Sequence, residues 1–505
     1  MQLLGPWEIS LVVIYLVAVL LGGWVTSRKE RGGTEDFFLG GRSVPWPAVL
    51  LSITATEISA VTFLGVPGTG FEGDLSYLQF GVGSLVARFV VAFLFLGAFY
   101  RSQCVSIYQY IGQRFGKVSH RTSAIFFLVS RINASAIRLL LAAAGLSLFF
   151  GVPIWAAVLL FSGVALIYTS SGGIRAVIWT DCIQAAVFIS GGIAVFIYLL
   201  GQVGFSQFWE VANESGKLRV FHWQVAEGTR WYGDWNLFYL AALNGLVMTS
   251  AALGCDQDLT QRMLTCRSVG RARWSVILSG FLGIPIAGLF LLVGVALFVW
   301  MQVNGVALPT DVGPNHVFAW FIAEVAPSGL RALLLIGILA TAMSSLDSAL
   351  NALSSSVVYD LVGDGARRSV MLSRLAILGF GGALAGIAIC LSDYQESFVW
   401  LGFKVVGVTY GALLGVFLLA LTTSIRWGKD GGNVVAMTLG TLVSAVLLLA
   451  SEREWISLGW TWIPLINTAM TYLVALNFRR QGPTLIGQLI GGLSGWITRC
   501  GRGAR

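Results

Sequence analysis

The amino-acid sequence predicts an all-α membrane protein with about thirteen transmembrane helices. Hydrophobic residues make up 56% of the 505-residue chain and charged residues only 11%, with a mean hydropathy of +0.80. Soluble domains of this size do not have that balance. Apolar stretches long enough to cross about 30 Å of hydrocarbon recur along the chain, and Lys and Arg collect in alternate loops, as in multi-pass proteins.

The predicted spans follow one another closely, and no stretch of the sequence indicates a soluble domain. The longest loop between spans, residues 203–233, is polar and aromatic, which favours a folded cap on the external face. The predicted spans are residues 7–26, 44–70, 80–100, 122–150, 152–169, 176–202, 234–253, 274–302, 315–323 running into 330–360, 371–391, 397–424, 433–450 and 459–478.

The charges that flank the spans predict the orientation. Glu8 lies at the start of the first span, and Arg28 and Lys29 follow it, so we expect the N-terminus outside the cell. Most basic residues, Arg262 among them, then fall in inward loops, and the C-terminal tail is cytoplasmic. The net charge of +8 thus reflects the topology of a multi-pass protein of a cell membrane, such as the bacterial inner membrane. It does not indicate a nucleic-acid partner.

Two spans contain polar and helix-breaking residues at mid-depth. The stretch "LSITATEISAVTFLGVPGTGF" contains Glu57 among hydroxyl residues and then Gly65 and Pro67, and "LAALNGLVMTSAALG" contains Asn244 and Gly245. These spans are five positions apart and so have opposite orientations. Interrupted spans at matching places in two inverted halves indicate the binding site of a transporter. Close packing of small residues between helices is the alternative.

The segment "ATAMSSLDSALNALSSS" combines hydroxyls with a carboxylate inside an apolar span. Thr341, Ser344, Asp347 and Ser348 recur at three- and four-residue steps and share one helix face. An ionised side chain at the bilayer centre costs ~2.5–3.5 kcal/mol, so Asp347 must face protein, water or a cation. Asp181 poses the same problem in the span 176–202.

Oxygen ligands without a nearby histidine favour an alkali cation over a transition metal. Backbone carbonyls for such a site must come from an unwound segment, and the stretch from Ala55 to Ile58 is suited to supply them. The residues alone leave an alternative open, in which Asp347 is neutral or pairs with Arg131 or Arg138. These two arginines stand seven apart in another span, on one helix face.

Four stretches in order resemble the sodium/solute symporter family, which includes cotransporters of glucose, iodide, proline, pantothenate and sialic acid. They are "FFLGGRSVPW", "SGGIRAVIWTDCIQ", "GCDQDLTQRMLTCRS" and "MSSLDSALNALSSSVVYDL". The resemblance covers residues 7–480. It implies a LeuT-type fold and a sodium-coupled symporter that imports a small organic solute by alternating access, with Na⁺ as the coupling ion and no enzymatic activity.

The resemblance also implies the division of the chain into segments. We expect an extra helix at residues 1–28, inverted repeats at 43–202 and 234–424, an external loop at 203–233, two further helices at 433–480, and a basic tail at 481–505.

The family's ion sites can be placed on this sequence residue by residue. The implied sodium site consists of Ala55, Ile58, Thr341, Ser344 and Ser345. A second cation site, present in some members, matches Asp181, Ser344, Asp347 and Ser348. Asp347 replaces a hydroxyl residue of the family here. Whether a second Na⁺, a proton or a pair of acids serves at this position therefore stays open.

The solute of the family lies between the first, third and sixth core helices. The implied binding residues are Glu57, Ser59, Thr62, Gln79, Arg138 and Asn244, with Arg131 as a further candidate. Glu57 replaces a neutral residue, which argues against a simple sugar. Glu57 and Arg138 either bind the two ends of a zwitterion or pair with each other, and a carboxylate-bearing solute is favoured.

The sequence alone leaves other functions as alternatives. They are a proton-coupled symporter, a transporter-like sensor, and an intramembrane aspartyl enzyme that uses Asp181 and Asp347. No GxGD-like motif accompanies either aspartate, which weighs against the enzyme.

Overall fold

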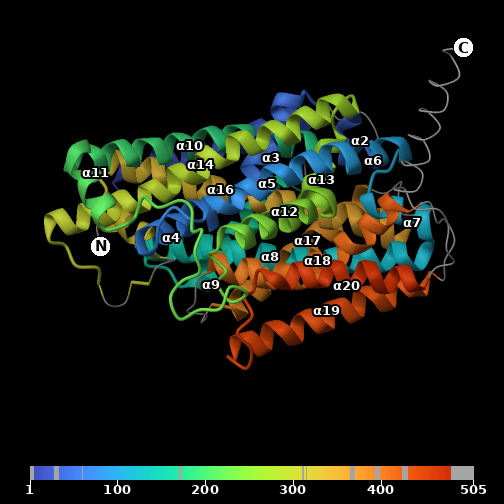
Figure 1. Cartoon of the computed structure of the whole chain (residues 1–505). Coiled ribbons are helices and arrows are strands. Elements are labelled where there is room, and N and C mark those ends of the chain that lie inside the picture. The colour runs from blue at the N-terminus through green and yellow to red at the C-terminus, as the bar shows by residue number, and fades with distance from the viewer. Residues whose placement is uncertain are drawn as a thin grey trace, which may run out of the picture.

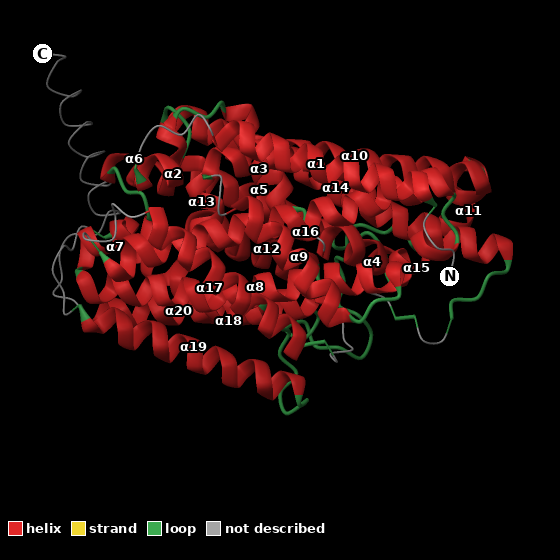
Figure 2. Ribbon diagram, turned by 180° about the vertical axis from the view of Figure 1, so that it is seen from behind, coloured by secondary structure: helices red, strands yellow, loops and turns green. Residues whose placement is uncertain are grey.

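The computed structural model describes residues 5–478 except 28–32, 60, 170–172, 310–311, 314–315, 364–369, 393–397 and 424–429. The basic tail predicted at 481–505 lies outside the described residues. Within them the protein is built from helices joined by loops, the longest of which connects Glu214 to Phe238 (Figures 1 and 2). The α-helices are α1 (Pro6–Ser27), α2 (Thr34–Leu39), α3 (Trp46–Glu57), α4 (Val66–Glu72), α5 (Leu78–Val90), α6 (Leu96–Ser102), α7 (Ile107–Phe115), α8 (Lys117–Phe150), α9 (Ile154–Thr169), α10 (Ile174–Val203), α11 (Phe205–Glu214), α12 (Phe238–Gly254), α13 (Gln257–Leu264), α14 (Val269–Asn304), α15 (Val317–Glu324), α16 (Ser328–Ser356), α17 (Val370–Cys390), α18 (Phe398–Thr422), α19 (Gly431–Glu452) and α20 (Trp462–Asn477).

Short helical turns of other types join or extend these helices. A π-helical turn, Val61–Gly65, leads into α4, and another, Val91–Phe95, joins α5 to α6. A third, Val357–Val362, extends α16, and a 3₁₀ turn, Gly40–Arg42, follows α2.

The long helices occupy the predicted spans. In the described part of the chain, eight helices are long and apolar enough to cross a membrane, or up to ten if the bent pairs α3/α4 and α12/α13 each count as one span. The remaining predicted spans contain α1, α9 and α20. The apolar part of α1, Pro6–Val19, and helix α9, which has 16 residues, are apolar but too short for that count. Helix α20 also has 16 residues and is less apolar than these two.

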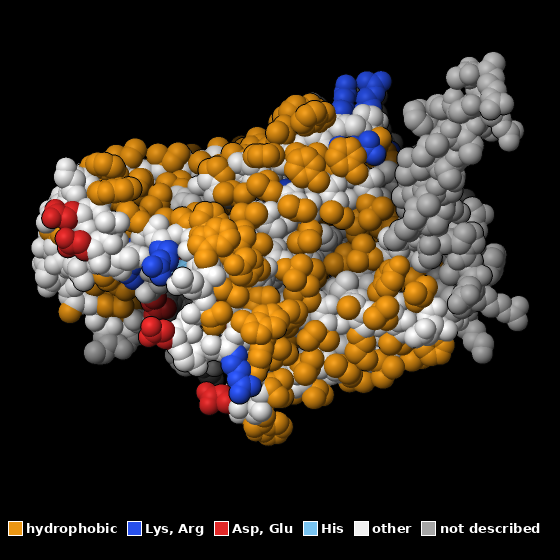
Figure 3. Space-filling model, in the orientation of Figure 1, with side chains coloured by type: hydrophobic (Ala, Val, Ile, Leu, Met, Phe, Trp, Pro, Cys, Tyr) orange, Lys and Arg blue, Asp and Glu red, His pale blue; other side chains and the backbone are white. Residues whose placement is uncertain are grey.

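The surface of the helices is apolar where lipid would contact it. Figure 3 shows hydrophobic side chains along the flank of the bundle and charged side chains mostly toward its ends. Ile14, Phe93, Ile197 and Val446 are each more than 60% exposed. A soluble protein rarely exposes apolar surface on this scale. The bundle is therefore a polytopic membrane domain.

The described chain begins and ends at opposite ends of the bundle. The start of α1 lies at the end where α4 and α11 lie (Figures 1 and 2), and Glu8 accepts a hydrogen bond there from Arg331 at 3.3 Å. The start of α20 is tied to the same end, because Gly459 N–H donates to the carbonyl of Tyr232 in the loop before α12. Since α20 runs away from that end, the arrangement fits an odd number of spans.

Two breaks interrupt the helices. The axis bends by 57° between α3 and the segment that contains α4, and by 61° between α12 and α13. After α3, the N–H of Ser59 donates to the carbonyl of Glu57, so the Ala55 carbonyl loses the helical partner that Ser59 would have provided. The second break lies after Gly254, where the Asp256 side chain caps α13. The break predicted near Asn244 is thus displaced, because that residue lies inside the regular helix α12.

Glycines bring two pairs of helices into backbone contact in a reciprocal way. A Cβ atom at Gly83 of α5 would lie 1.7 Å from a carbonyl oxygen of α12, and one at Gly245 of α12 would lie 2.1 Å from a carbonyl oxygen of α5. Likewise, a Cβ atom at Gly70 of α4 would lie 2.3 Å from a carbonyl oxygen of α14, and one at Gly294 of α14 would lie 2.0 Å from a carbonyl oxygen of α4. Small residues allow such close crossings.

The reciprocal crossings relate the first and second halves of the chain. Helix α4 belongs to the first predicted core helix and packs on α14, the seventh. Helix α12, the sixth, packs on α5, the second. The first helix of each half thus packs on the second helix of the other half, as expected of two inverted repeats. We therefore propose that the repeats occupy residues 43–202 and 234–424, preceded by α1 and followed by α19 and α20.

Candidate ion and solute sites

The break after α3 packs against the hydroxyl-rich part of α16. The Ser344 hydroxyl oxygen lies 3.3 Å from the Ala55 carbonyl oxygen and donates to Asp181 Oδ1 of α10 at 2.9 Å. A hydroxyl has one hydrogen, so the bond to Asp181 leaves the lone pairs of the Ser344 oxygen available to a cation. Residues far apart in the sequence thus form one oxygen-lined centre.

The other residues predicted for the sodium site are buried at the same level of the bundle. Ile58, Thr341 and Ser345 are at most 4% exposed. The Thr341 hydroxyl donates to the Ile338 carbonyl at 3.0 Å. The Thr341 backbone carbonyl has two lone pairs, so it can bind an ion while it accepts a helical hydrogen bond inside α16. The Ser345 hydroxyl has no hydrogen-bond partner among the described residues. Buried hydroxyls normally have a partner, and an ion bound here would provide one. The donor set fits a hard cation such as Na⁺.

An arginine that the sequence analysis placed in a loop occupies the predicted second cation site. Arg262 of α13 donates through Nη2 to Asp181 Oδ2 at 3.2 Å and also to the Ser348 hydroxyl. Its Nε donates to the Ser52 hydroxyl at 2.8 Å, which in turn donates to Asp181 Oδ2 at 2.5 Å. The Arg262 side chain is completely buried. Its signal in the sequence was weak, because only the bend before α13 returns this polar helix to the core.

A chain of buried ion pairs continues from this arginine toward α8. Asp258 accepts from Arg262 Nη1 at 2.6 Å and from Arg131 Nη2. Arg131 Nη1 lies 3.3 Å from Asp256, which also accepts from the Tyr410 hydroxyl. The carboxylate partners of Arg131 are thus the two aspartates beside the second break. In the alternative left open by the sequence, Arg131 or Arg138 would pair with Asp347; Arg131 pairs with Asp256 and Asp258.

A cavity of about 260 Å³ is lined by residues of the first break and by Arg131 and Tyr410 of the ion-pair chain. Of the predicted solute residues, Glu57, Ser59, Thr62 and Arg138 line it, as does Arg131. Arg131 and Tyr410 connect this lining to the chain of ion pairs, because both bond to Asp256.

Two aromatic residues, Tyr77 and Phe80, also line the cavity. The rings of Tyr77 and Phe80 stack at 6.3 Å, and both residues also border a small hollow that reaches Trp235 and Trp460 in the loops at the α4/α11 end. The cavity is therefore directed toward that end of the bundle.

Glu57 pairs with Arg88, which is not among the residues predicted for the solute site. Both carboxylate oxygens of Glu57 lie 2.9 Å from Arg88 Nη2 of α5, and Arg88 Nη1 donates to the Ser279 hydroxyl at 2.8 Å. The predicted pair of Glu57 with Arg138 is therefore replaced by a different one. Gly280 makes room for it, since a Cβ there would lie 2.3 Å from the Arg88 side chain. The signal for Arg88 was its place inside an apolar span.

Two residues predicted to bind solute do not line the cavity. Gln79 uses its amide group to join loops, donating to the Asn236 carbonyl and accepting from the His222 N–H, both at 2.9 Å. Asn244 donates to the Thr461 carbonyl at 2.9 Å. Their polar groups hold the structure near the α4/α11 end together, and we leave them out of the solute site.

Arg138 differs from the other three arginines of the centre. It lines the cavity and is half-buried, yet it forms no ion pair and no side-chain hydrogen bond with any residue in the described part of the chain. Arg88, Arg131 and Arg262 each have carboxylate partners. A positive charge at this depth is costly unless a counter-charge or water stabilises it, so the cavity is suited to an anionic ligand.

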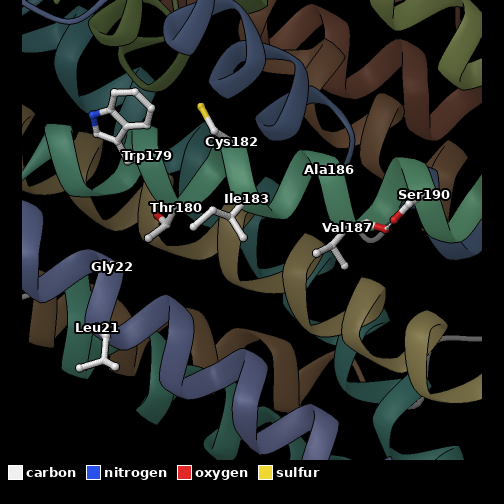
Figure 4. Close-up of a pocket in the computed structure, with 9 residues that line it drawn as sticks. All are labelled: Leu21, Gly22, Trp179, Thr180, Cys182, Ile183, Ala186, Val187 and Ser190. Carbon is white, nitrogen blue, oxygen red and sulfur yellow. Dashed lines mark hydrogen bonds between the residues drawn. The ribbon is translucent and has the colours of Figure 1, made fainter.

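A larger hollow of about 960 Å³ lies between α1 and α10 and does not have this chemistry. Figure 4 shows the residues that line it, Leu21 and Gly22 on α1 and a row of mostly apolar residues on α10. The Thr180 and Ser190 hydroxyls in this row donate to carbonyls of their own helix. No charged residue of the described part of the chain belongs to the lining, and Trp179 is 46% exposed. We assign this hollow to the lipid-facing surface.

Comparison with known proteins identifies the class of transporter. Sodium/sialic acid symporter SiaT of Proteus mirabilis (strain HI4320) is 28% identical over 452 residues, 87% of this chain and 88% of that protein. Sodium-coupled monocarboxylate transporter 2 of Danio rerio is 28% identical over 426 residues, 81% of this chain and 67% of that protein. A solved structure of a Na⁺-coupled sialic acid symporter in a substrate-bound outward-open state covers 95% of this chain and 99% of its own, with a TM-score of 0.82 and 24% identity.

These findings confirm the predicted LeuT-type fold, the multi-pass membrane location and the role of Na⁺ as coupling ion. The protein is a sodium-coupled solute symporter and not an enzyme. The sequence model named "Sodium:solute symporter family" matches residues 37–440. The chain therefore belongs to the sodium:solute symporter family.

Proposed function

We propose that the protein imports a small carboxylate-bearing anion together with Na⁺ by alternating access, and that Arg138 binds the carboxylate. The observation that supports this most strongly is the charge distribution in the 260 Å³ cavity. Arg88 neutralises Glu57 there, so a zwitterion would find no free carboxylate for its ammonium group. Arg138 is the cation left to pair with a ligand. The sialic acid and monocarboxylate symporters among the relatives are named for anionic solutes, which favours the same class here.

The proposed sodium site couples ion binding to the shape of the cavity. Na⁺ would be held by the carbonyls of Ala55, Ile58 and Thr341 and the hydroxyls of Ser344 and Ser345. Because the break after α3 also supplies Glu57 and neighbouring lining residues, fixing the break against α16 fixes one wall of the solute site. Separation of α3 from α16 would then release ion and solute together. A tenfold Na⁺ gradient supplies ~1.4 kcal/mol to this step.

We also propose the orientation in the membrane that the loop charges predict. The N-terminus and the α4/α11 end face outside, and the C-terminus is cytoplasmic. In this orientation the cavity lies on the outer side of the Arg131 and Arg262 ion pairs, which close the path toward the cytoplasm.

Matched acids and esters test the solute class. The purified protein is warmed with sialic acid, pyruvate or lactate, or with the methyl ester of each, in NaCl or in KCl. We expect at least one acid to raise the midpoint of thermal unfolding in NaCl and its ester to have no effect. Ligand at about 100 times its Kd adds ~2.7 kcal/mol of stability, which is readily measured. An ester as effective as its acid, or a response confined to neutral sugars, would contradict the proposal.

The Ser345→Ala variant tests the sodium site. We expect the Na⁺ concentration for half-maximal uptake or stabilisation to rise about tenfold or more, since the ion loses a ligand worth at least ~1.4 kcal/mol. Ser354→Ala is the control. It removes a buried hydroxyl from the same helix, but this hydroxyl donates to the Ser373 carbonyl and lies outside the site. An unchanged Na⁺ dependence in Ser345→Ala would exclude this hydroxyl from the site.

A further inference from the structure

Arg262 satisfies every hydrogen-bond donor of its guanidinium group inside the protein. The group has five N–H donors, and five acceptors surround it. Nη1 donates to the backbone and side-chain oxygens of Asp258 at 2.7 and 2.6 Å. Nη2 donates to Asp181 and Ser348, and Nε donates to Ser52 at 2.8 Å. The arginine is thus held as tightly as a bound cation and leaves no donor for a ligand.

The acceptors of Arg262 are oxygens that a second cation would need. Asp181 Oδ2 and the Ser348 oxygen belong to the second cation set predicted from the sequence, and both accept from Nη2. The Ser348 hydroxyl hydrogen is directed to the Ser344 carbonyl at 2.5 Å, and that of Ser52 to Asp181. Each group already has its partners, so a metal ion could bind only by displacing the guanidinium.

Displacement would be costly at this place. Arg262 has 0% side-chain exposure, and Asp258 holds it from the side away from Asp181. The Asp258 carboxylate in turn joins Arg131, so removing Arg262 would disturb a second ion pair. A Na⁺ ion placed beside a guanidinium that stays in position would experience strong like-charge repulsion in this water-poor centre.

We propose that Arg262 is a built-in cation that fills the second cation site, so that a single Na⁺ accompanies each solute. The inference rests on the proposed sodium site and extends it to the stoichiometry. The first site remains available, because it uses Ser344 lone pairs, the Ser345 hydroxyl and backbone carbonyls, none of which bonds to Arg262. The extra acid Asp347, which replaces a hydroxyl residue of the family, therefore does not by itself indicate a second ion.

Direct counting of bound ions tests the inference. Purified full-length protein is equilibrated with ²²Na⁺, and the ions bound per chain and the Hill coefficient are measured. We expect saturation at a single Na⁺ with a Hill coefficient of one. Two ions per chain in the natural protein would overturn the inference but leave the proposed sodium symport intact. No bound Na⁺ at all would overturn the sodium site itself, and this inference with it.

Two variants test whether the positive charge is the cause. Arg262→Gln removes the charge, and we expect a folded variant to bind a second Na⁺. Arg262→Lys keeps the charge, and we expect it to bind a single ion. A purely structural role of the arginine would not predict this difference. If Arg262→Gln is monodisperse and still binds one ion, the inference is wrong; if it does not fold, the count on the natural protein decides.

Discussion

Replacement of Asp258 by asparagine is expected to destabilise the protein by about 3–5 kcal/mol, the usual effect of removing one partner from a buried ion pair. Asp258 is 1% exposed and joins Arg131 to Arg262. Asparagine has nearly the same shape, so the loss reports charge and not volume. We expect a lower midpoint of thermal unfolding and a reduced yield of monodisperse protein.

A matched substitution in a more exposed ion pair provides the control. Asp36 lies 3.4 Å from Arg175, and these side chains are 17% and 25% exposed. Ion pairs with access to water contribute ~0–1 kcal/mol, so Asp36→Asn should change the midpoint little. Equal losses in the two variants would show that the buried network has no special role in stability.

The Arg138→Gln variant is expected to lower solute affinity about 100-fold or more. Truncating one partner of a desolvated charge pair costs ~2–5 kcal/mol, and in this variant the solute carboxylate would lose the one lining arginine that no carboxylate of the described residues already pairs with. We expect the free protein to be as stable as the natural one, because Arg138 has no partner among the described residues. Sodium-dependent uptake, or stabilisation by the acid identified in the ester comparison, measures the affinity.

Arg131→Gln is the matched control for this variant. It lies seven residues earlier on the same helix face and also lines the cavity, but it pairs with Asp256 and Asp258. Its loss should reduce the stability of the free protein, whereas the loss of Arg138 should not. If Arg138→Gln binds the acid normally, the carboxylate is held elsewhere.

The sequence predicted the spans well because the bilayer imposes a simple rule on them. A segment must be apolar over about 20 residues to cross, and this pattern is visible without knowledge of neighbouring helices. The contact between Ala55 and Ser344 was also anticipated, although from the family resemblance. Spacing alone does not predict that a broken helix and a hydroxyl-rich one meet.

The partners of the charged residues were not predictable in the same way. Arg138 was the predicted partner of Glu57. The pairing with Arg88 instead depends on the tertiary placement of α5 near α3 and on the space left by Gly280. Arg262 was assigned to a loop because the short helix α13 is polar. The 61° bend before it, which returns it to the core, is a property of the tertiary structure.

The guanidinium beside Asp181 has an energetic consequence for the transport cycle. A positive charge that belongs to the polypeptide is never released into the cytoplasm, so it consumes no ion gradient. With one mobile Na⁺ and a monovalent anion, import is electroneutral. The membrane potential then neither drives nor opposes accumulation of the solute, and the difference in Na⁺ concentration alone sets its limit.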